Sequence, residues 1–154
     1  MRRWLRLAID SVFPGTCEAC AQALPPGYPI CLCPGCRATM TSPVPPLCAC
    51  CGVPLGSEPA PERCAACIGR PPTFISARSA GLYLPTTAGL NPLAVAIHAL
   101  KYRGRRVVAN ALGHLLAERY PFAPTALLVP VPLHRVRLRD RGYNQALLLA
   151  RVLG

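Results

Sequence analysis

Apolar residues recur at helical spacing in the second half of the chain. Residues 92–102 begin with a proline, which suits the first turn of a helix, and Gly104 follows as a typical stop residue. Residues 105–120 show the same spacing, and residues 145–152 follow Asn144, a good N-cap. The pattern therefore predicts three amphipathic helices. Their apolar faces are Leu93, Ile97 and Leu100 in the first, Val108, Leu112, Leu115 and Leu116 in the second, and Leu147, Leu148 and Val152 in the third.

Two other stretches predict β-strands. Residues 76–84 end at a proline-containing turn, and residues 126–131 are apolar throughout. An unbroken apolar run of this kind fits a central parallel strand that is buried on both faces. A basic loop over residues 133–142 follows it, and then the helix of residues 145–152. Strand, loop and helix in this order predict an α/β architecture with a parallel sheet.

The basic loop is a candidate anion site. Ligands of open α/β sheets bind beyond the carboxyl ends of the strands, and phosphates favour helix N-termini. Composition fits a solvated charged loop equally well, because charged residues also favour solvent. A second basic cluster at residues 101–106 is better explained by favourable charge at a helix C-terminus. The candidate residues of the loop are His134, Arg135, Arg137, Arg139, Arg141 and Gly142.

Cysteine pairs dominate the first half of the chain. The second member of each pair follows the first after two residues, and twelve residues separate the first pair from the second and the third from the fourth. A shift of 31 positions superimposes the first two pairs on the last two, so the region is a tandem repeat. The paired residues are Cys17, Cys20, Cys33, Cys36, Cys48, Cys51, Cys64 and Cys67.

This spacing is typical of structural zinc sites. Two cysteines two residues apart direct their sulfurs to one point, and two such pairs form a tetrahedral four-sulfur cage that suits Zn²⁺. Disulfides and buried structural cysteines are the alternatives. Cys31 and Cys50 have no partner in the repeat and are expected to be spectators, although Cys31 could compete with Cys33. The sequence also leaves open a cage that combines cysteines from both repeats.

Composition supports metal-dependent folding. Thirteen of the 19 prolines lie between Pro14 and Pro72, where few apolar runs exist, so two zinc ions must supply much of the folding free energy. The formal charge of +11 makes an anionic partner plausible. The spacing of apolar residues predicts an amphipathic helix over residues 1–13. No signal-peptide cleavage site follows this segment, and no apolar stretch of the sequence is long enough for a transmembrane helix. We expect a reduced, cytoplasmic protein.

Three features together resemble the ComF family. They are the double four-cysteine region, the stretch Leu100-Lys-Tyr-Arg-Gly104, and Val131-Pro-Leu-His-Arg135 followed by Arg141-Gly-Tyr-Asn-Gln145. The resemblance implies a double zinc ribbon, a type I phosphoribosyltransferase-like domain and an association with DNA uptake in competent bacteria. It also implies that residues 132–142 contact the pyrophosphate of phosphoribosyl pyrophosphate. This favours the anion site over a merely solvated loop.

The resemblance also shows what the sequence lacks. Family members continue with a strand, an acidic pair and a Thr/Gly-rich turn that hold the ribose and the 5′-phosphate. The 154 residues contain no such segment, so the chain resembles the N-terminal part of a family member, and we expect it to have no catalytic residues and no transfer activity. An apolar strand without its neighbours also predicts poor solubility.

We therefore predict a small β-rich, metal-stabilised zinc-ribbon domain followed by an incomplete α/β domain. The predicted boundaries are residues 1–13 for the N-terminal helix, 14–71 for the double ribbon and 72–154 for the phosphoribosyltransferase-like part. Single-stranded DNA and other DNA-uptake proteins are the expected partners. A non-catalytic module that binds nucleic acid or docks proteins is the alternative, although the sparse aromatic residues argue against strong base stacking.

Overall fold

The computed structural model describes residues 15–25, 28, 31–56, 59–83, 91–121, 123 and 125–154. The helix predicted for residues 1–13 lies outside these residues. The chain divides into two compact units, one formed by Met1–Met40 together with Tyr83–Gly154, and the other by Thr41–Leu82. We call them unit 1 and unit 2. The two four-cysteine repeats therefore belong to different units.

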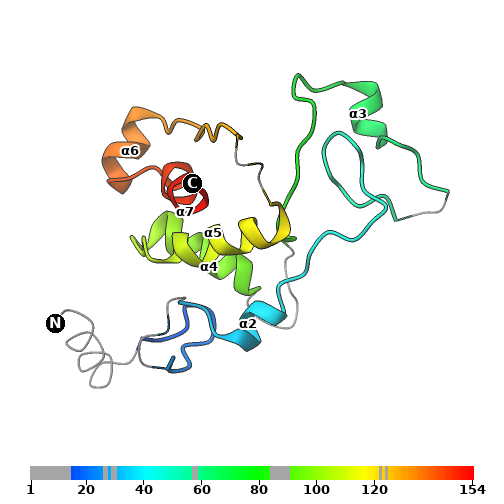
Figure 1. Ribbon diagram of the computed structural model, residues 1–154. Helices are drawn as coiled ribbons and strands as arrows, with labels where there is room; N and C mark the ends of the chain where they lie inside the picture. Colours follow the sequence, from blue (N-terminus) through cyan, green and yellow to red (C-terminus); the bar gives the residue numbers. More distant parts are fainter. Residues whose placement is uncertain are drawn as a thin grey trace. The chain divides into compact units, whose positions relative to one another are not determined.

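Three helices form the core of unit 1, and all three were predicted from apolar spacing. They are α4 (Pro92–Tyr102), α5 (Val108–Arg119) and α7 (Gln145–Leu153) (Figure 1). The Asn91 side chain caps α4 by accepting hydrogen bonds from two backbone N–H groups, and Asn144 caps α7 in the same way with one. Helix α5 packs against both α4 and α7. Buried core residues include Leu93, Ala96, Leu100, Val108, Leu112 and Leu115.

A glycine brings α5 and α7 close together. Gly113 faces Val152, and a Cβ atom at position 113 would lie 2.6 Å from the Val152 Cγ1 atom. Asn144 joins α7 to the preceding chain as well, because its side-chain amide donates a 2.9 Å hydrogen bond to the carbonyl of Val131. The short approach at Gly113 makes this helix pair sensitive to added volume.

The predicted parallel sheet is wrong. Within the described residues, neither 76–83 nor 126–131 forms a strand, and backbone pairing of the β type is confined to two isolated bridges. Residues 126–131 have no assigned secondary structure and form no β-bridge, and Leu127, Val129 and Val131 are exposed by 87%, 76% and 74%. A strand needs a partner for its backbone groups, and the described chain supplies none. Because these apolar side chains are exposed, we still expect the chain to be poorly soluble.

The predicted β-rich character of the cysteine region is also wrong. In the described part, each repeat consists of turns, one antiparallel bridge and one short helix, α2 (Pro34–Ala38) in the first and α3 (Ala65–Gly69) in the second. The bridges join Thr16 to Ala23 and Leu47 to Pro54. Pro54 has no N–H group to extend a ladder, which limits β pairing in the second repeat.

The segment predicted as a basic loop is helical. Helix α6 (Arg135–Arg141) ends at Gly142, which has the left-handed φ of 75° and whose N–H donates to the carbonyl of Leu138. Arginine favours helices, and a glycine at this position allows the abrupt end. None of the described helices has the length and apolarity that crossing a membrane requires.

Candidate metal centres and a basic pocket

Eight of the ten cysteines form two clusters in the described structure. One contains Cys17, Cys20, Cys33 and Cys36, and the other contains Cys48, Cys51, Cys64 and Cys67; within each, the sulfur atoms lie within 4.8 Å of one another. Neither cluster combines cysteines from both repeats, so the interleaved alternative is excluded. Cys31 and Cys50 stay outside the clusters, as the sequence predicted, and all ten cysteines are free thiols.

The two repeats have the same backbone hydrogen bonds at positions 31 residues apart. The N–H of Cys33 donates to the Cys17 sulfur at 3.3 Å, and the N–H of Cys64 donates to the Cys48 sulfur at the same distance. Each turn closes with a bond to the carbonyl of its first cysteine, from Ala21 in one repeat and Gly52 in the other. Short cysteine turns thus position the sulfurs without a sheet.

Backbone N–H groups lower the pKa of one thiol in each cluster. Burial raises the pKa of Cys17, but N–H groups, chiefly that of Cys33, oppose this and bring it to about 6. For Cys48, the N–H of Cys64 has the largest effect, and the pKa again falls to about 6. Hydrogen bonds to the charged form stabilise a thiolate. Each cluster therefore contains a ready anionic sulfur at neutral pH.

The geometry of the clusters fits a zinc ion. Four sulfurs around Zn²⁺ at about 2.3 Å would form a tetrahedron with edges of about 3.8 Å. The sulfurs of Cys20 and Cys33 are 3.7 Å apart, and so are those of Cys51 and Cys64. Burial and the neighbouring thiols raise the pKa of Cys36, so a bound cation would be needed to deprotonate the full set.

Cys31 differs from the cluster cysteines in its electrostatics. Burial, followed by the nearby carboxylate of Glu18, raises the pKa of Cys31 to about 11. A neutral thiol is a poor metal ligand. Cys31 lies outside the four-sulfur cluster, which contains Cys33 two positions further along the chain.

The first repeat is joined to the helices of unit 1 by two ion pairs. Glu18, inside the first cysteine turn, accepts a 2.5 Å hydrogen bond from the Arg105 guanidinium. Arg37, on α2, donates to both carboxylate oxygens of Glu118 at 2.8 and 2.9 Å. The corresponding positions of the second repeat are Ala49 and Ile68, which cannot form these pairs. The ion pairs are thus specific to the first repeat.

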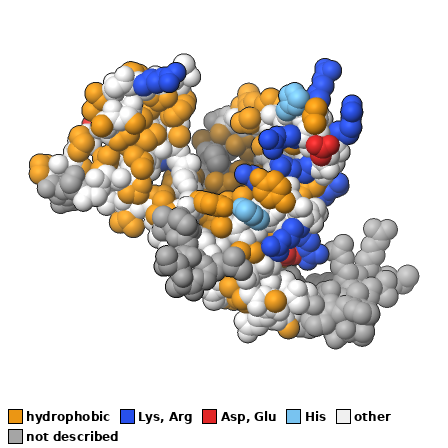
Figure 2. Space-filling model, turned by 180° about the vertical axis from the view of Figure 1, so that it is seen from behind, with side chains coloured by type: hydrophobic (Ala, Val, Ile, Leu, Met, Phe, Trp, Pro, Cys, Tyr) orange, Lys and Arg blue, Asp and Glu red, His pale blue; other side chains and the backbone are white. Residues whose placement is uncertain are grey.

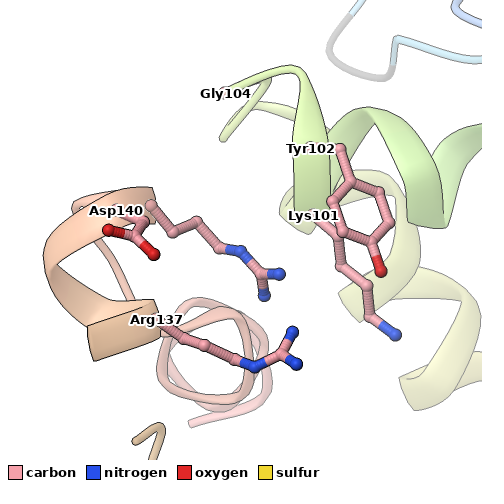
Figure 3. A pocket seen from close by; sticks show the side chains of 6 residues that line it. Lys101, Tyr102, Gly104, Arg137 and Asp140 are labelled. Atoms are coloured by element: carbon pink, nitrogen blue, oxygen red, sulfur yellow. The ribbon is translucent and has the colours of Figure 1, made fainter. Parts of the chain in front are cut away.

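A basic pocket of about 380 Å³ lies between α6 and the C-terminal end of α4. Arg137 extends from α6 toward Lys101 and Tyr102 at the end of α4 (Figure 3). On this part of the face in Figure 2, Lys and Arg side chains gather around an acidic one. The cations outnumber the one carboxylate, so the pocket suits an anion. The lining residues are Lys101, Tyr102, Gly104, Arg137, Asp140 and Arg141.

The structure brings together two of the six residues predicted for the anion site. Arg137 and Arg141 line the pocket, whereas Arg135 and Arg139 are exposed on α6 without lining it. His134 lies at the N-terminal boundary of α6, and Gly142 lies at its C-terminal boundary. The carbonyl of Gly142 accepts a hydrogen bond from Arg106 at 3.4 Å.

Four of the six pocket residues were not among the predicted anion-site residues: Lys101, Tyr102, Gly104 and Asp140. Lys101 and Tyr102 were attributed to the end of a helix, but they face α6 across the pocket. The available signal was the stretch Leu100-Lys-Tyr-Arg-Gly104, which carried part of the family resemblance. Its separation from α6 by more than thirty residues concealed the contact.

A buried hydrogen bond and two cation–π contacts hold the two sides of the pocket together. Tyr143, a buried residue just after α6, donates its hydroxyl hydrogen to the carbonyl of Leu100 in α4. The Arg106 guanidinium lies over the Tyr143 ring at 4.7 Å, and that of Arg141 lies over the Tyr102 ring at 5.4 Å. These contacts hold the end of α4 beside α6.

The described residues form two four-cysteine clusters that could hold metal ions. They also form a basic pocket from residues further along the sequence. Curated proteins named DNA utilization protein YhgH are similar to it. The Escherichia coli (strain K12) protein is 34% identical over 148 residues, covering 91% of this chain and 60% of the relative. The Salmonella typhi protein is 33% identical over 146 residues, covering 90% and 53%.

The chain thus spans between about half and three fifths of the length of these relatives. No family model and no solved structure matches it. The comparison therefore shows similarity to proteins named DNA utilization protein.

Proposed function

We propose that the chain is the zinc-scaffolded, phosphate-binding part of a DNA-handling protein of the ComF family. The observation that carries the proposal is the convergence of Lys101, Arg137 and Arg141 on one pocket. The name of the relatives, DNA utilization protein, supports DNA as the source of the phosphate. In this proposal the pocket binds backbone phosphates of single-stranded DNA during DNA uptake.

The cysteine clusters act as scaffolds in this proposal. A zinc ion with four thiolate ligands has no open coordination position, so it stabilises structure rather than catalysing a reaction. We assign residues 14–71 to the double metal-binding region and residues 72–154 to the phosphate-binding part. The predicted N-terminal segment of residues 1–13 precedes them. A reducing cytoplasm would keep the thiols available for the metal.

Arginine and lysine supply complementary chemistry for phosphate. A guanidinium donates two parallel hydrogen bonds to phosphate oxygens, whereas the Lys101 ammonium acts as a compact charge. Asp140 opposes them with one carboxylate, which favours a ligand that contacts the cationic side of the pocket. The pocket chemistry would therefore accept a phosphodiester in many sequence contexts.

The resemblance to the ComF family suggests a second, smaller ligand. The pyrophosphate of phosphoribosyl pyrophosphate presents the same oxygen atoms, and Arg137 and Arg141 belong to the stretch that carries the resemblance. We propose it as a ligand of the complete protein. A transfer reaction is not part of the proposal.

One observation favours an additional protein-docking role for unit 2. Where Arg37 pairs with Glu118 in the first repeat, the second repeat carries exposed Ile68, and Phe74 and Ile75 are exposed as well. Exposed apolar groups of this kind suit a protein partner, here another component of DNA uptake. Ile68→Arg should weaken capture of such a partner while leaving DNA binding unchanged.

Fluorescence anisotropy with a labelled oligothymidylate tests the main proposal. Arg137→Ala should weaken binding by the zinc-loaded chain about tenfold, because a charge-assisted hydrogen bond is lost. Arg135→Ala removes the same charge from the same helix outside the pocket and should have a much smaller effect. Equal effects of the two substitutions would contradict the pocket assignment. Competition by phosphoribosyl pyrophosphate would separately test the small ligand.

A further inference from the structure

Three aromatic side chains adjoin the basic pocket on the surface of unit 1. The hydroxyl of Tyr83 lies 2.9 Å from the Nε2 atom of His98, and the two rings are inclined by 20°. The His98 ring meets the Tyr102 ring edge-on, with centroids 5.4 Å apart. Tyr83 and Tyr102 are exposed by 56% and 65%, and His98 is exposed too. We call Tyr83, His98 and Tyr102 the aromatic surface.

Core packing does not explain this surface. Buried residues of α4 such as Val95, Ala99 and Leu100 lie on the face of the helix that packs inward. His98 and Tyr102 are four positions apart and share the exposed face. An exposed cluster of rings leaves apolar faces in water, which favours a planar ligand.

The aromatic surface continues into the pocket through one residue. Tyr102 belongs to both, and the guanidinium of Arg141 lies over its ring while also lining the pocket. A single nucleotide combines a phosphate with a flat base one sugar away. The neighbouring cations and rings therefore match the two halves of one nucleotide.

We propose that Tyr83, His98 and Tyr102 form a base-stacking surface for single-stranded nucleic acid whose phosphate occupies the pocket. This inference rests on the proposed function and adds base contacts to it. Stacking tolerates every base, so the surface would bind without sequence preference. It revises the expectation that sparse aromatic residues argue against strong base stacking, because the fold places Tyr83 beside two rings of α4.

Two oligonucleotides separate base contacts from phosphate contacts. One is a labelled oligothymidylate, and the other is an abasic strand of the same length and charge. Tyr102→Ala should weaken oligothymidylate binding about tenfold and abasic binding much less, because one stacked base is lost. Tyr102→Phe keeps the ring and should bind like the unaltered chain. His98→Ala should weaken oligothymidylate binding, whereas His114→Ala, at an exposed histidine of α5, should not.

Arg137→Ala distinguishes this inference from the proposed function. It should weaken binding of both strands, because both carry phosphates. If Arg137→Ala weakens both strands but Tyr102→Ala and His98→Ala change neither, the base-stacking surface is refuted and the phosphate pocket stands. If Tyr102→Ala weakens both strands equally, the ring acts through Arg141 and the inference fails. If the unaltered chain binds neither strand, the proposed function fails first. Circular dichroism of each variant verifies that the helices remain folded.

Discussion

Ala21 and Gly52 occupy the same position of the two cysteine repeats, 31 residues apart, and both have positive φ angles, of 60° and 72°. In each repeat this residue closes the turn after a cysteine pair by donating its N–H to the first cysteine of that pair. The left-handed conformation suits glycine and strains alanine. At position 52 a Cβ would also lie 2.6 Å from the carbonyl oxygen of Ala77.

The two positions should therefore respond in opposite directions to exchange of glycine and alanine. Ala21→Gly should raise the free energy of unfolding of the zinc-loaded chain by about 1 kcal/mol, because strain is removed. Gly52→Ala should lower it, because strain and a clash with backbone are added. Urea unfolding measures both, and Gly56→Ala is a control with positive φ but open space. A neutral Gly52→Ala would contradict the close approach of residue 77.

Added volume at Gly113 should disrupt the packing of α5 on α7. Gly113→Ala should lower the free energy of unfolding by about 1–3 kcal/mol, despite the better helix propensity of alanine, because the methyl group meets Val152. Combining it with Val152→Ala makes room and should recover part of the loss. A double variant as unstable as the sum of the single variants would show that the two residues are not in contact.

The ion pair between Glu18 and Arg105 should contribute measurably to the stability of unit 1. The Glu18 side chain is 10% exposed, so its carboxylate depends on Arg105 more than a surface carboxylate would. Glu18→Gln should cost about 1 kcal/mol. Glu62→Gln, in the second repeat, is the control and should change little. A double-variant cycle with Arg105→Gln that gave additive losses would argue against the pair.

Metal loading should depend on the eight cluster cysteines and on pH. Cys17→Ser and Cys48→Ser should each remove about one of two bound zinc ions, whereas Cys31→Ser and Cys50→Ser should remove none. The folded-state pKa of about 6 for Cys17 and Cys48 lies below the ordinary value of 9.0, so the thiolate contribution is present at high pH and declines as the pH falls. Zinc should stay bound at pH 7, and its loss should increase as the pH falls, because protons compete with the metal for the thiolates.

Zinc analysis after dialysis at stepped pH checks this expectation. Loss of zinc from the Cys31→Ser variant at pH 7 would place Cys31 among the ligands. A chelator should also unfold the cysteine repeats, because metal binding supplies their folding free energy.

Local patterns predicted the parts of the fold that depend on local physics. Helices α4, α5 and α7 follow from apolar spacing and from caps such as Asn91 and Asn144, which act within a few residues. The cysteine clusters follow from spacing for the same reason, since two turns and a repeat of 31 suffice to pair them.

Features that depend on distant partners were not predictable in this way. The apolar stretch of residues 126–131 has strand composition, but a strand forms only when another strand pairs with it. Helix α6 was not predicted because its sequence is mostly charged and lacks the apolar spacing of an amphipathic helix. The pocket joins Lys101 to Arg137, and no local pattern links positions so far apart. The family resemblance indicated both stretches without showing that they meet.

The salt dependence of single-stranded DNA binding tests the central claim most directly. Each lost phosphate contact should reduce the slope of log affinity against log salt concentration by about 0.7 for single strands. We expect a slope about 0.7 shallower for Arg137→Ala than for the unaltered zinc-loaded chain, and an unchanged slope for Arg135→Ala. A slope that Arg137→Ala leaves unchanged, or that Arg135→Ala reduces equally, would contradict phosphate binding in the pocket.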